Sequence, residues 1–329
     1  MEFSQGFVDA YAQVYRKSMT ATPENVDRVQ IAIVEAMSDK YALAENALIV
    51  HAKSYLERKI LWQPEAALMA LDVLLADHFE ENNVARLARA KIHTEAALCA
   101  YAIAKDSSVD DVRSALDLAT AELTGPDPDI LVQRIRTNYV AAGIFSRSDD
   151  STKLHRADDY LTAASNDIER LQRSLERPQL PSTGRADYWN VHMIGAQVAA
   201  RLWKTMPDNA DLRSRALEHV AEAVKQMWDW QGEEADPKAY ERYEALTPFY
   251  AAEVMVTLGE ASHAVDQFAA LFIMRHGPIN AYRDNEDIRK RADGVTRGIA
   301  PFLRADRLRL NAYRRDVFDL PALEFPVIE

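Results

Sequence analysis

The chain has 329 residues, a net charge of -12 and one cysteine, Cys99. Its negative charge argues against a general affinity for nucleic acid, because the field of an acidic protein repels a polyanion. A single cysteine excludes an intramolecular disulfide, and together with an N-terminus that lacks a basic and apolar leader it makes the cytoplasm the expected location.

Apolar residues recur at helical spacing through the first half of the chain, and the breaks between these stretches coincide with turn or capping residues. Pro64 stands at the first position of one expected helix, and Asp127-Pro128 opens another after a glycine and a proline. The expected helices cover approximately residues 7–15, 23–37, 39–62, 64–75, 83–105, 110–123, 128–146 and 151–177.

The second half begins after residues 178–184, PQLPSTG, the most loop-like stretch of the chain. We take this stretch as the boundary between two helical parts, residues 1–177 and 185–329, which together either form two domains or one continuous array. Helices are expected over residues 188–204, 210–230, 245–257, 260–276, 286–297 and 301–315. The tail, DVFDLPALEFPVIE, is apolar and contains two prolines, so it is expected to pack back over the last helices as a cap.

Several consecutive helix pairs share one pattern, in which a small residue on the first helix faces alanine and leucine on the second. The clearest example runs from Ala245 to Pro278. Its residues Ala252, Gly259, Ala264, Phe268 and Leu271 have the spacing of the small residue, turn glycine, alanine, aromatic residue and final apolar residue of the tetratricopeptide repeat, which this segment resembles. Other pairs depart from that pattern, because their helices are longer and most of the consensus tryptophan, tyrosine and proline residues are missing.

The resemblance implies an all-α fold, an α-α superhelix or solenoid of antiparallel helix hairpins. It also implies a scaffold or adaptor that binds a protein or peptide along a concave face lined by the first helix of each pair. The residues placed on that face would be Tyr101, Gln133, Thr137, Trp189, His192, Phe249 and Glu253.

Aromatic residues concentrate near this expected face, with four of the five tryptophans between positions 189 and 230. Such a concentration indicates either a well-packed core or the wall of a binding groove. Near the C-terminus basic residues outnumber acidic ones, and Arg289, Arg291, Arg304 and Arg307 form either a basic patch for an acidic partner or the solvated face of two terminal helices.

Motifs for catalysis, cofactors or metals are not found in the sequence. The glycines form no phosphate-binding loop, and the histidines show neither HExxH nor the paired Glu-x-x-His of a di-iron bundle. The leading interpretation is therefore a binding scaffold without cofactor or metal. A helical enzyme or small-ligand receptor with a pocket in the aromatic C-terminal half, and a self-assembling structural subunit, are the alternatives.

Overall fold

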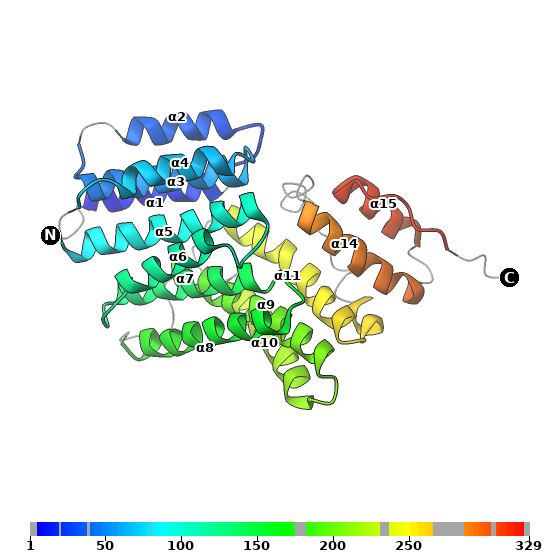
Figure 1. The fold of residues 1–329 in the computed structure, drawn as a ribbon. Coiled ribbons are helices and arrows are strands. Elements are labelled where there is room, and N and C mark those ends of the chain that lie inside the picture. Colours follow the sequence, from blue (N-terminus) through cyan, green and yellow to red (C-terminus); the bar gives the residue numbers. More distant parts are fainter. Residues whose placement is uncertain are drawn as a thin grey trace. The chain divides into compact units, whose positions relative to one another are not determined.

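Figure 1 shows the computed structural model of the chain, in which every described element is a helix. The structure describes residues 5–19, 21–37, 40–79, 81–174, 182–230, 237–265, 286–303 and 307–325, and these residues contain no strand. The predicted all-α fold class is confirmed.

Contacts within the chain divide it into two compact units. The N-terminal unit comprises Met1–Ser148 and Arg156–Asp187, and the C-terminal unit comprises Asp149–His155 and Tyr188–Glu329. Helices α8, Ser151–Ser174, and α9, Ser182–Thr205, each contain residues of both units.

The N-terminal unit is built from two layers of helices. Helices α1, α3, α5 and α7 follow one another side by side in one layer, which we call the helix row. In the second layer α2 contacts α1 and α3, α4 contacts α3 and α5, and α6 contacts α5 and α7 (Figure 1). The bounds are α1 Gln5–Met19, α2 Val26–Ala36, α3 Leu43–Lys59, α4 Pro64–Leu75, α5 Asn83–Ala104, α6 Asp110–Glu122 and α7 Pro128–Phe145.

Local sequence signals account for the ends of several of these helices. The Asn82 side chain accepts a hydrogen bond from the backbone N–H of Ala85 and caps α5, and Asp127 caps α7 through the N–H of Asp129. Lys105 ends α5 in the left-handed conformation, with φ 56°. The buried faces of α1, α2 and α3 then join in one apolar cluster around Ile33, Leu48 and Leu56.

The C-terminal unit contains the later part of α9, then α10, α11, α14, the 3-10 helix η1 and α15. Their bounds are α10 Ala210–Trp230, α11 Pro237–Thr257, α14 Glu286–Ile299, η1 Ala300–Phe302 and α15 Arg307–Phe318. Helix α11 packs against α10 and α14, and α14 packs against α15. At Gly298 the helices approach closely, because an added Cβ would lie 2.6 Å from Cγ1 of Val256 on α11 and would force one of them to shift.

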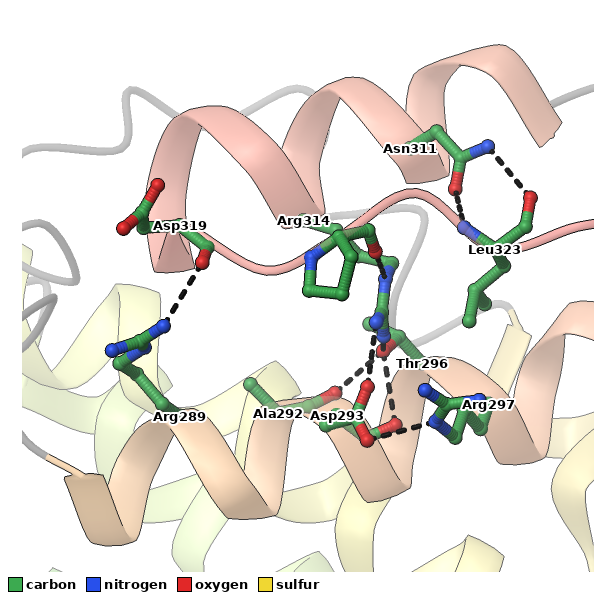
Figure 2. A network of polar contacts seen from close by, with 10 residues as sticks. Arg289, Ala292, Asp293, Thr296, Arg297, Asn311, Arg314, Asp319 and Leu323 are labelled. Carbon is green, nitrogen blue, oxygen red and sulfur yellow. Dashed lines mark hydrogen bonds and ion pairs between the residues drawn. The ribbon is translucent and has the colours of Figure 1, made fainter.

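The described part of the tail lies along α15 and is fixed by side chains of α14 and α15 (Figure 2). Asn311 bonds both the N–H and the carbonyl oxygen of Leu323, at 2.8 and 3.1 Å. Arg289 donates to the carbonyl oxygen of Asp319, and Arg314 donates to that of Pro321, each at 3.0 Å. These contacts replace the backbone hydrogen bonds that an irregular segment cannot make for itself.

Some predicted boundaries need correction. Residues 182–184 were expected to be loop, but they form the first residues of α9, while residues 178–181 lie outside the described part of the chain. Helix α11 begins at Pro237, before the Ala245 at which the hairpin was expected to start, and continues through Pro248. The final helix was expected to end at residue 315 but continues to Phe318.

Candidate functional site

Polar side chains gather where the helices of the row face one another in the N-terminal unit. Four of the helices contribute two residues each, one or two turns apart, so that they lie on one side of the helix, and α9 contributes one residue. We call these residues the polar cluster: Tyr11 and Tyr15 of α1, His51 and Arg58 of α3, Lys91 and Glu95 of α5, Arg136 and Tyr139 of α7, and Asp187 of α9.

Arg58 and Glu95 form a buried ion pair across α3 and α5. The Nε atom of Arg58 lies 2.6 Å from Oε1 of Glu95, and the two side chains expose only 14% and 5% of their surfaces. Burial by itself raises the pKa of Glu95, but the neighbouring Arg58 guanidinium outweighs it, so the pKa is lowered from its ordinary value. Glu95 is therefore ionised and neutralised by Arg58.

Arg136 and Asp187 form a second ion pair, between α7 and α9. Nε of Arg136 lies 3.0 Å from each oxygen of Asp187, and the hydroxyl of Tyr139 donates to the same carboxylate at 3.2 Å. Burial opposes the charge on Arg136, but Asp187 and Tyr15 raise its pKa above the ordinary value. Arg136 is therefore a fixed cation, and its terminal nitrogens make no hydrogen bond to a described residue.

Lys91 differs from the two arginines because no carboxylate pairs with it within the described residues. Its Nζ lies 5.0 Å from the centre of the Tyr11 ring, a cation–π contact. Burial, followed by repulsion from Arg136, lowers the pKa of Lys91 from 10.5 to about 7. The cluster thus contains an amine that changes its charge near neutral pH.

His51 is the second member of the cluster without a partner. Its Nδ1 atom is buried and makes no hydrogen bond to any part of the chain that the structure describes. Burial lowers the pKa of His51 to about 4, although the nearby Glu95 favours the charged form. His51 is therefore neutral at pH 7, with an unsatisfied nitrogen among charged neighbours.

His51 should make the N-terminal unit less stable in mild acid. Its pKa is about 4 in the folded chain and 6.5 in the unfolded chain, so the unfolded state takes up the proton first. His51 does not affect the pH dependence above pH 6.5, and its contribution to stability is lost as the pH falls from 6.5 to about 4. Hydrogen exchange of α3 peptides across this range should show the loss in the wild type and a flatter profile in His51→Gln.

A matched control for His51→Gln is His263→Gln, at a side chain that is 73% exposed in the C-terminal unit. This variant should keep the pH profile of the wild type in α3. Identical profiles for the wild type and His51→Gln would show that His51 is not the group responsible.

Two residues predicted to lie on an exposed face, Gln133 and Thr137, are instead buried, at 4% and 1% exposure. The hydroxyl of Thr137 lies 2.9 Å from that of Thr94 on α5, and the amide of Gln133 donates to Thr137 at 3.5 Å. Their polar groups satisfy one another between α5 and α7, so they belong to the packed interior of the helix row. Tyr101 is half-buried and carries Arg147 over its ring, with the guanidinium 5.4 Å from the ring centre.

Trp189 and Phe249, the expected aromatic anchors, are also buried. Trp189 is 3% exposed, and its Nε1–H donates to the Thr247 hydroxyl at 2.9 Å. Phe249 is 1% exposed, and its ring centre lies 5.9 Å from that of Phe318 on α15. The expected exposure of these two residues is corrected, because each fills the core of the C-terminal unit, and Trp189 also satisfies its indole N–H there. Trp228 and Trp230 have side chains outside the described part.

Two further predicted residues make polar contacts within the C-terminal unit. Nδ1 of His192 lies 2.9 Å from Nδ1 of His219, and burial lowers the pKa of His192 to about 4. Glu253 forms an ion pair with Arg291, a residue of the predicted basic patch, and Arg291 also lies over the Tyr250 ring. The structure thus pairs Glu253 with Arg291 rather than presenting both to a partner.

The other arginines of the predicted basic patch have separate environments. Arg289 bonds the tail at Asp319, as described above, and Arg307 donates to the carbonyl oxygen of Leu303 at 3.1 Å and lies over the Phe325 ring. Arg304 lies outside the described residues. The structure therefore gives the three described arginines, Arg289, Arg291 and Arg307, separate partners within the C-terminal unit.

The repeat-like segment can be followed only in part. Ala252 and Ala264 are fully buried, and Gly259 has φ 75°, a left-handed conformation that favours glycine at the turn. Phe268 and Leu271 lie outside the described residues. Cys99 is buried, and burial raises the pKa of its thiol to about 12, which makes it a poor nucleophile.

Within the described residues, no three or more His, Cys, Asp or Glu side chains converge as metal ligands. A shallow open hollow on the surface of the N-terminal unit is lined by Asp110, Arg113, Ser114, Asp117, Leu118 and Arg156. Its arginines already have neighbours, since Arg113 pairs with Asp110 and Arg156 lies over Phe145. The polar cluster is the stronger candidate site.

Sequence reasoning did not single out the polar cluster. One signal was present: Lys91 and Glu95 stand one turn apart in a helix that is rich in alanine and apolar after Glu95, a composition that favours burial. A charged pair in such a helix must find partners on neighbouring helices. Identifying those partners required the order in which the helices pack.

No helix of the described residues has the length and apolar character needed to cross a membrane. Comparison of the chain with protein-family models, with curated proteins and with solved structures gave no match.

Proposed function

We propose that the chain is a binding scaffold of the α-solenoid type, organised like a tetratricopeptide array, which binds a protein or peptide partner in the cytoplasm. The packing of the N-terminal unit supports this proposal. Each helix of the second layer contacts two consecutive helices of the row, which is the neighbour-to-neighbour packing of stacked hairpins.

The observation that carries the proposal is the polar cluster itself. Most of the interior of the N-terminal unit is apolar. Beside the rings of Tyr11 and Tyr15, however, the amine of Lys91 and the terminal nitrogens of Arg136 have no hydrogen-bond acceptor among the described residues. Retaining the amine of Lys91 lowers stability, because a charged group without an ion-pair partner is costly where water is scarce. Binding of a partner that supplies the missing acceptors would compensate this cost, and arginine and tyrosine are typical of interface centres.

Comparative capture of partners tests the proposed function. Wild-type protein and the variants Lys91→Met and Lys53→Met are immobilised at equal density, and proteins retained from a lysate of the source cells are quantified by mass spectrometry. Lys53 is the matched control, because it lies on the row helix α3 but pairs with Glu57 on the same helix. We expect at least one protein to be retained by the wild type and Lys53→Met and reduced at least about tenfold by Lys91→Met.

Equal retention of every protein by the three baits would remove the polar cluster as the binding site. The change at Lys91 suits this test, because methionine has similar length and no described residue forms an ion pair with the amine that the change would leave unpaired. Variants of Trp189 or Phe249 would not be informative, since both side chains lie in the core.

A further inference from the structure

The hydrogen-bonding groups of the polar cluster are unevenly used. The carboxylate of Glu95 is taken by Arg58, and that of Asp187 by Nε of Arg136 and the hydroxyl of Tyr139. No acidic group of the described residues pairs with the amine of Lys91 or bonds the terminal nitrogens of Arg136. Together the amine and these nitrogens offer about seven N–H donors.

The two tyrosines of α1 place these donors next to each other. The rings of Tyr11 and Tyr15 are stacked, with centres 5.9 Å apart. Lys91 lies over the first ring and Arg136 over the second, at 5.0 and 5.8 Å from the ring centres. An amine of α5 and a guanidinium of α7 are thus supported on adjacent rings, and their mutual repulsion contributes to the lowered pKa of Lys91.

With Lys91 uncharged, the two arginines of the polar cluster balance its two carboxylates, and protonation of Lys91 makes the cluster positive although the chain as a whole carries -12. When Lys91 is protonated, three cations, Arg58, Lys91 and Arg136, face the two carboxylates of Glu95 and Asp187. Asp129 and Asp187 both attract the charged Lys91. Within the described residues, however, no carboxylate bonds the amine of Lys91 or the terminal nitrogens of Arg136, so an anion beside these two groups would gain direct charge-assisted hydrogen bonds. A carboxylate has two oxygens with about four acceptor sites, which is fewer than the roughly seven N–H donors of Lys91 and Arg136. A phosphate group has three strongly accepting oxygens and a negative charge close to two. A phosphate therefore matches these donors better than a carboxylate does.

We propose that Lys91 and Arg136 bind the phosphate group of a ligand between α5 and α7. This inference rests on the proposed function, because it names the chemistry that the same site recognises. The terminal nitrogens of Arg136 bond two phosphate oxygens in the paired geometry that guanidinium groups favour, and the Lys91 ammonium neutralises the remaining charge. Nε of Arg136 stays on Asp187, which holds the guanidinium in place.

Proton uptake should accompany phosphate binding. In the free protein Lys91 is largely uncharged above pH 7, and a bound dianion beside the amine raises its pKa again. At pH 8 the complex therefore gains close to one proton on Lys91. The charged and titratable groups around this amine are Tyr11 and Tyr15 of α1, His51 and Arg58 of α3, Glu95 of α5, Asp129, Arg136 and Tyr139 of α7, and Asp187 of α9.

Titration calorimetry with inorganic phosphate at pH 8 tests the proposal. Titrations in two buffers with different enthalpies of ionisation give the number of protons taken up. We expect saturable binding at one site with uptake close to one proton, and weaker binding of acetate. Absence of saturable binding, binding without proton uptake, or tighter binding of acetate would each overturn the proposal.

Two variants separate the site from general charge effects. Lys91→Met should weaken phosphate binding at least about tenfold and remove the proton uptake. The Lys91→Met variant should be at least as heat-stable as the wild type. The folded state lowers the pKa of Lys91, so this amine makes folding less favourable at pH 7, and its removal takes that cost away. Arg136→Gln/Asp187→Asn removes both charges of one pair and should also weaken binding, whereas Lys53→Met should bind like the wild type. Unchanged binding by Lys91→Met contradicts the assignment.

Titrations of a phosphoserine peptide and of glycerol 3-phosphate then distinguish the source of the phosphate. Tighter binding of the peptide indicates a phosphorylated protein partner, and tighter binding of glycerol 3-phosphate indicates a small molecule. The two proposals fail separately. Phosphate binding that depends on Lys91, with partner capture unaffected by Lys91→Met, would keep the phosphate site and reject the scaffold function. Partner capture that depends on Lys91, without phosphate binding, would keep the scaffold function and reject the phosphate site.

Discussion

Replacing Arg58 with methionine is expected to destabilise the N-terminal unit by about 3–5 kcal/mol, which is typical of removing one member of a buried ion pair. The substitution leaves the carboxylate of Glu95 only 5% exposed and without its cation. Most of the effect comes from that stranded charge, because two exposed ions of the same kind would contribute about 1 kcal/mol or less. Hydrogen exchange of peptides from α3 and α5 measures the change, with α10 and α11 as an internal control.

The double variant Arg58→Met/Glu95→Leu distinguishes a stranded charge from lost packing. It removes both ions, so it should be much more stable than Arg58→Met alone and close to the wild type. A double variant as unstable as the single one would show that the aliphatic part of Arg58, rather than its charge, supports α3 and α5.

The pH dependence gives the same pair a second test. In the wild type the pKa of Glu95 is lowered on folding, so the pair contributes fully above the ordinary pKa of 4.5 and its contribution is lost as the pH falls through the lower, folded value. In Arg58→Met the main opposition to burial is gone, and burial, the largest influence on the pKa of Glu95, raises it, so protonation favours the folded variant. The destabilisation caused by Arg58→Met should therefore shrink as the pH approaches 4.

Much of the helical organisation could be predicted because it depends on neighbouring residues. Pro64 begins α4, Asn82 caps α5, and Gly259 takes the left-handed turn conformation, each as its chemistry requires. The boundaries that were missed depend on distant contacts. Helix α11 continues through Pro248, where the Thr247 hydroxyl bonds the carbonyl oxygen of Tyr243 and receives the indole N–H of Trp189 from α9.

The candidate site was predicted less well, because helical spacing does not say which neighbour a face will meet. An aromatic residue on an apolar face fits a core and a groove equally, and Phe249 was assigned to a groove although Phe318 covers it from α15. Lys91 and Tyr11 lie on different helices. Their side chains meet only because α1, α3 and α5 pack side by side. The sequence shows which residues are charged, but it does not show which residues they contact in the fold.

Arg314 should be the residue on which the fold of the C-terminal end depends most. It is fully buried, and its guanidinium bonds Asp293 at 2.5 Å, the Thr296 hydroxyl, and the carbonyl oxygen of Pro321 at 3.0 Å (Figure 2). One side chain thus joins α14, α15 and the tail. Asp293 is 32% exposed and keeps Arg297 as a partner, so the stranded charge costs less here than at Glu95.

Arg314→Met is therefore expected to destabilise the C-terminal unit by about 2–4 kcal/mol, because it removes three charge-assisted hydrogen bonds from a buried site. Hydrogen exchange should increase in α14, α15 and the tail, and α3 and α5 should be unchanged. Arg315→Met is the matched control, since the adjacent side chain is 71% exposed and pairs only with Asp316 in the described structure. If both variants exchange like the wild type, Arg314 does not hold the tail. If Arg314→Met loosens α14 but leaves the tail protected, Asn311 and its bonds to Leu323 are sufficient to fix the tail.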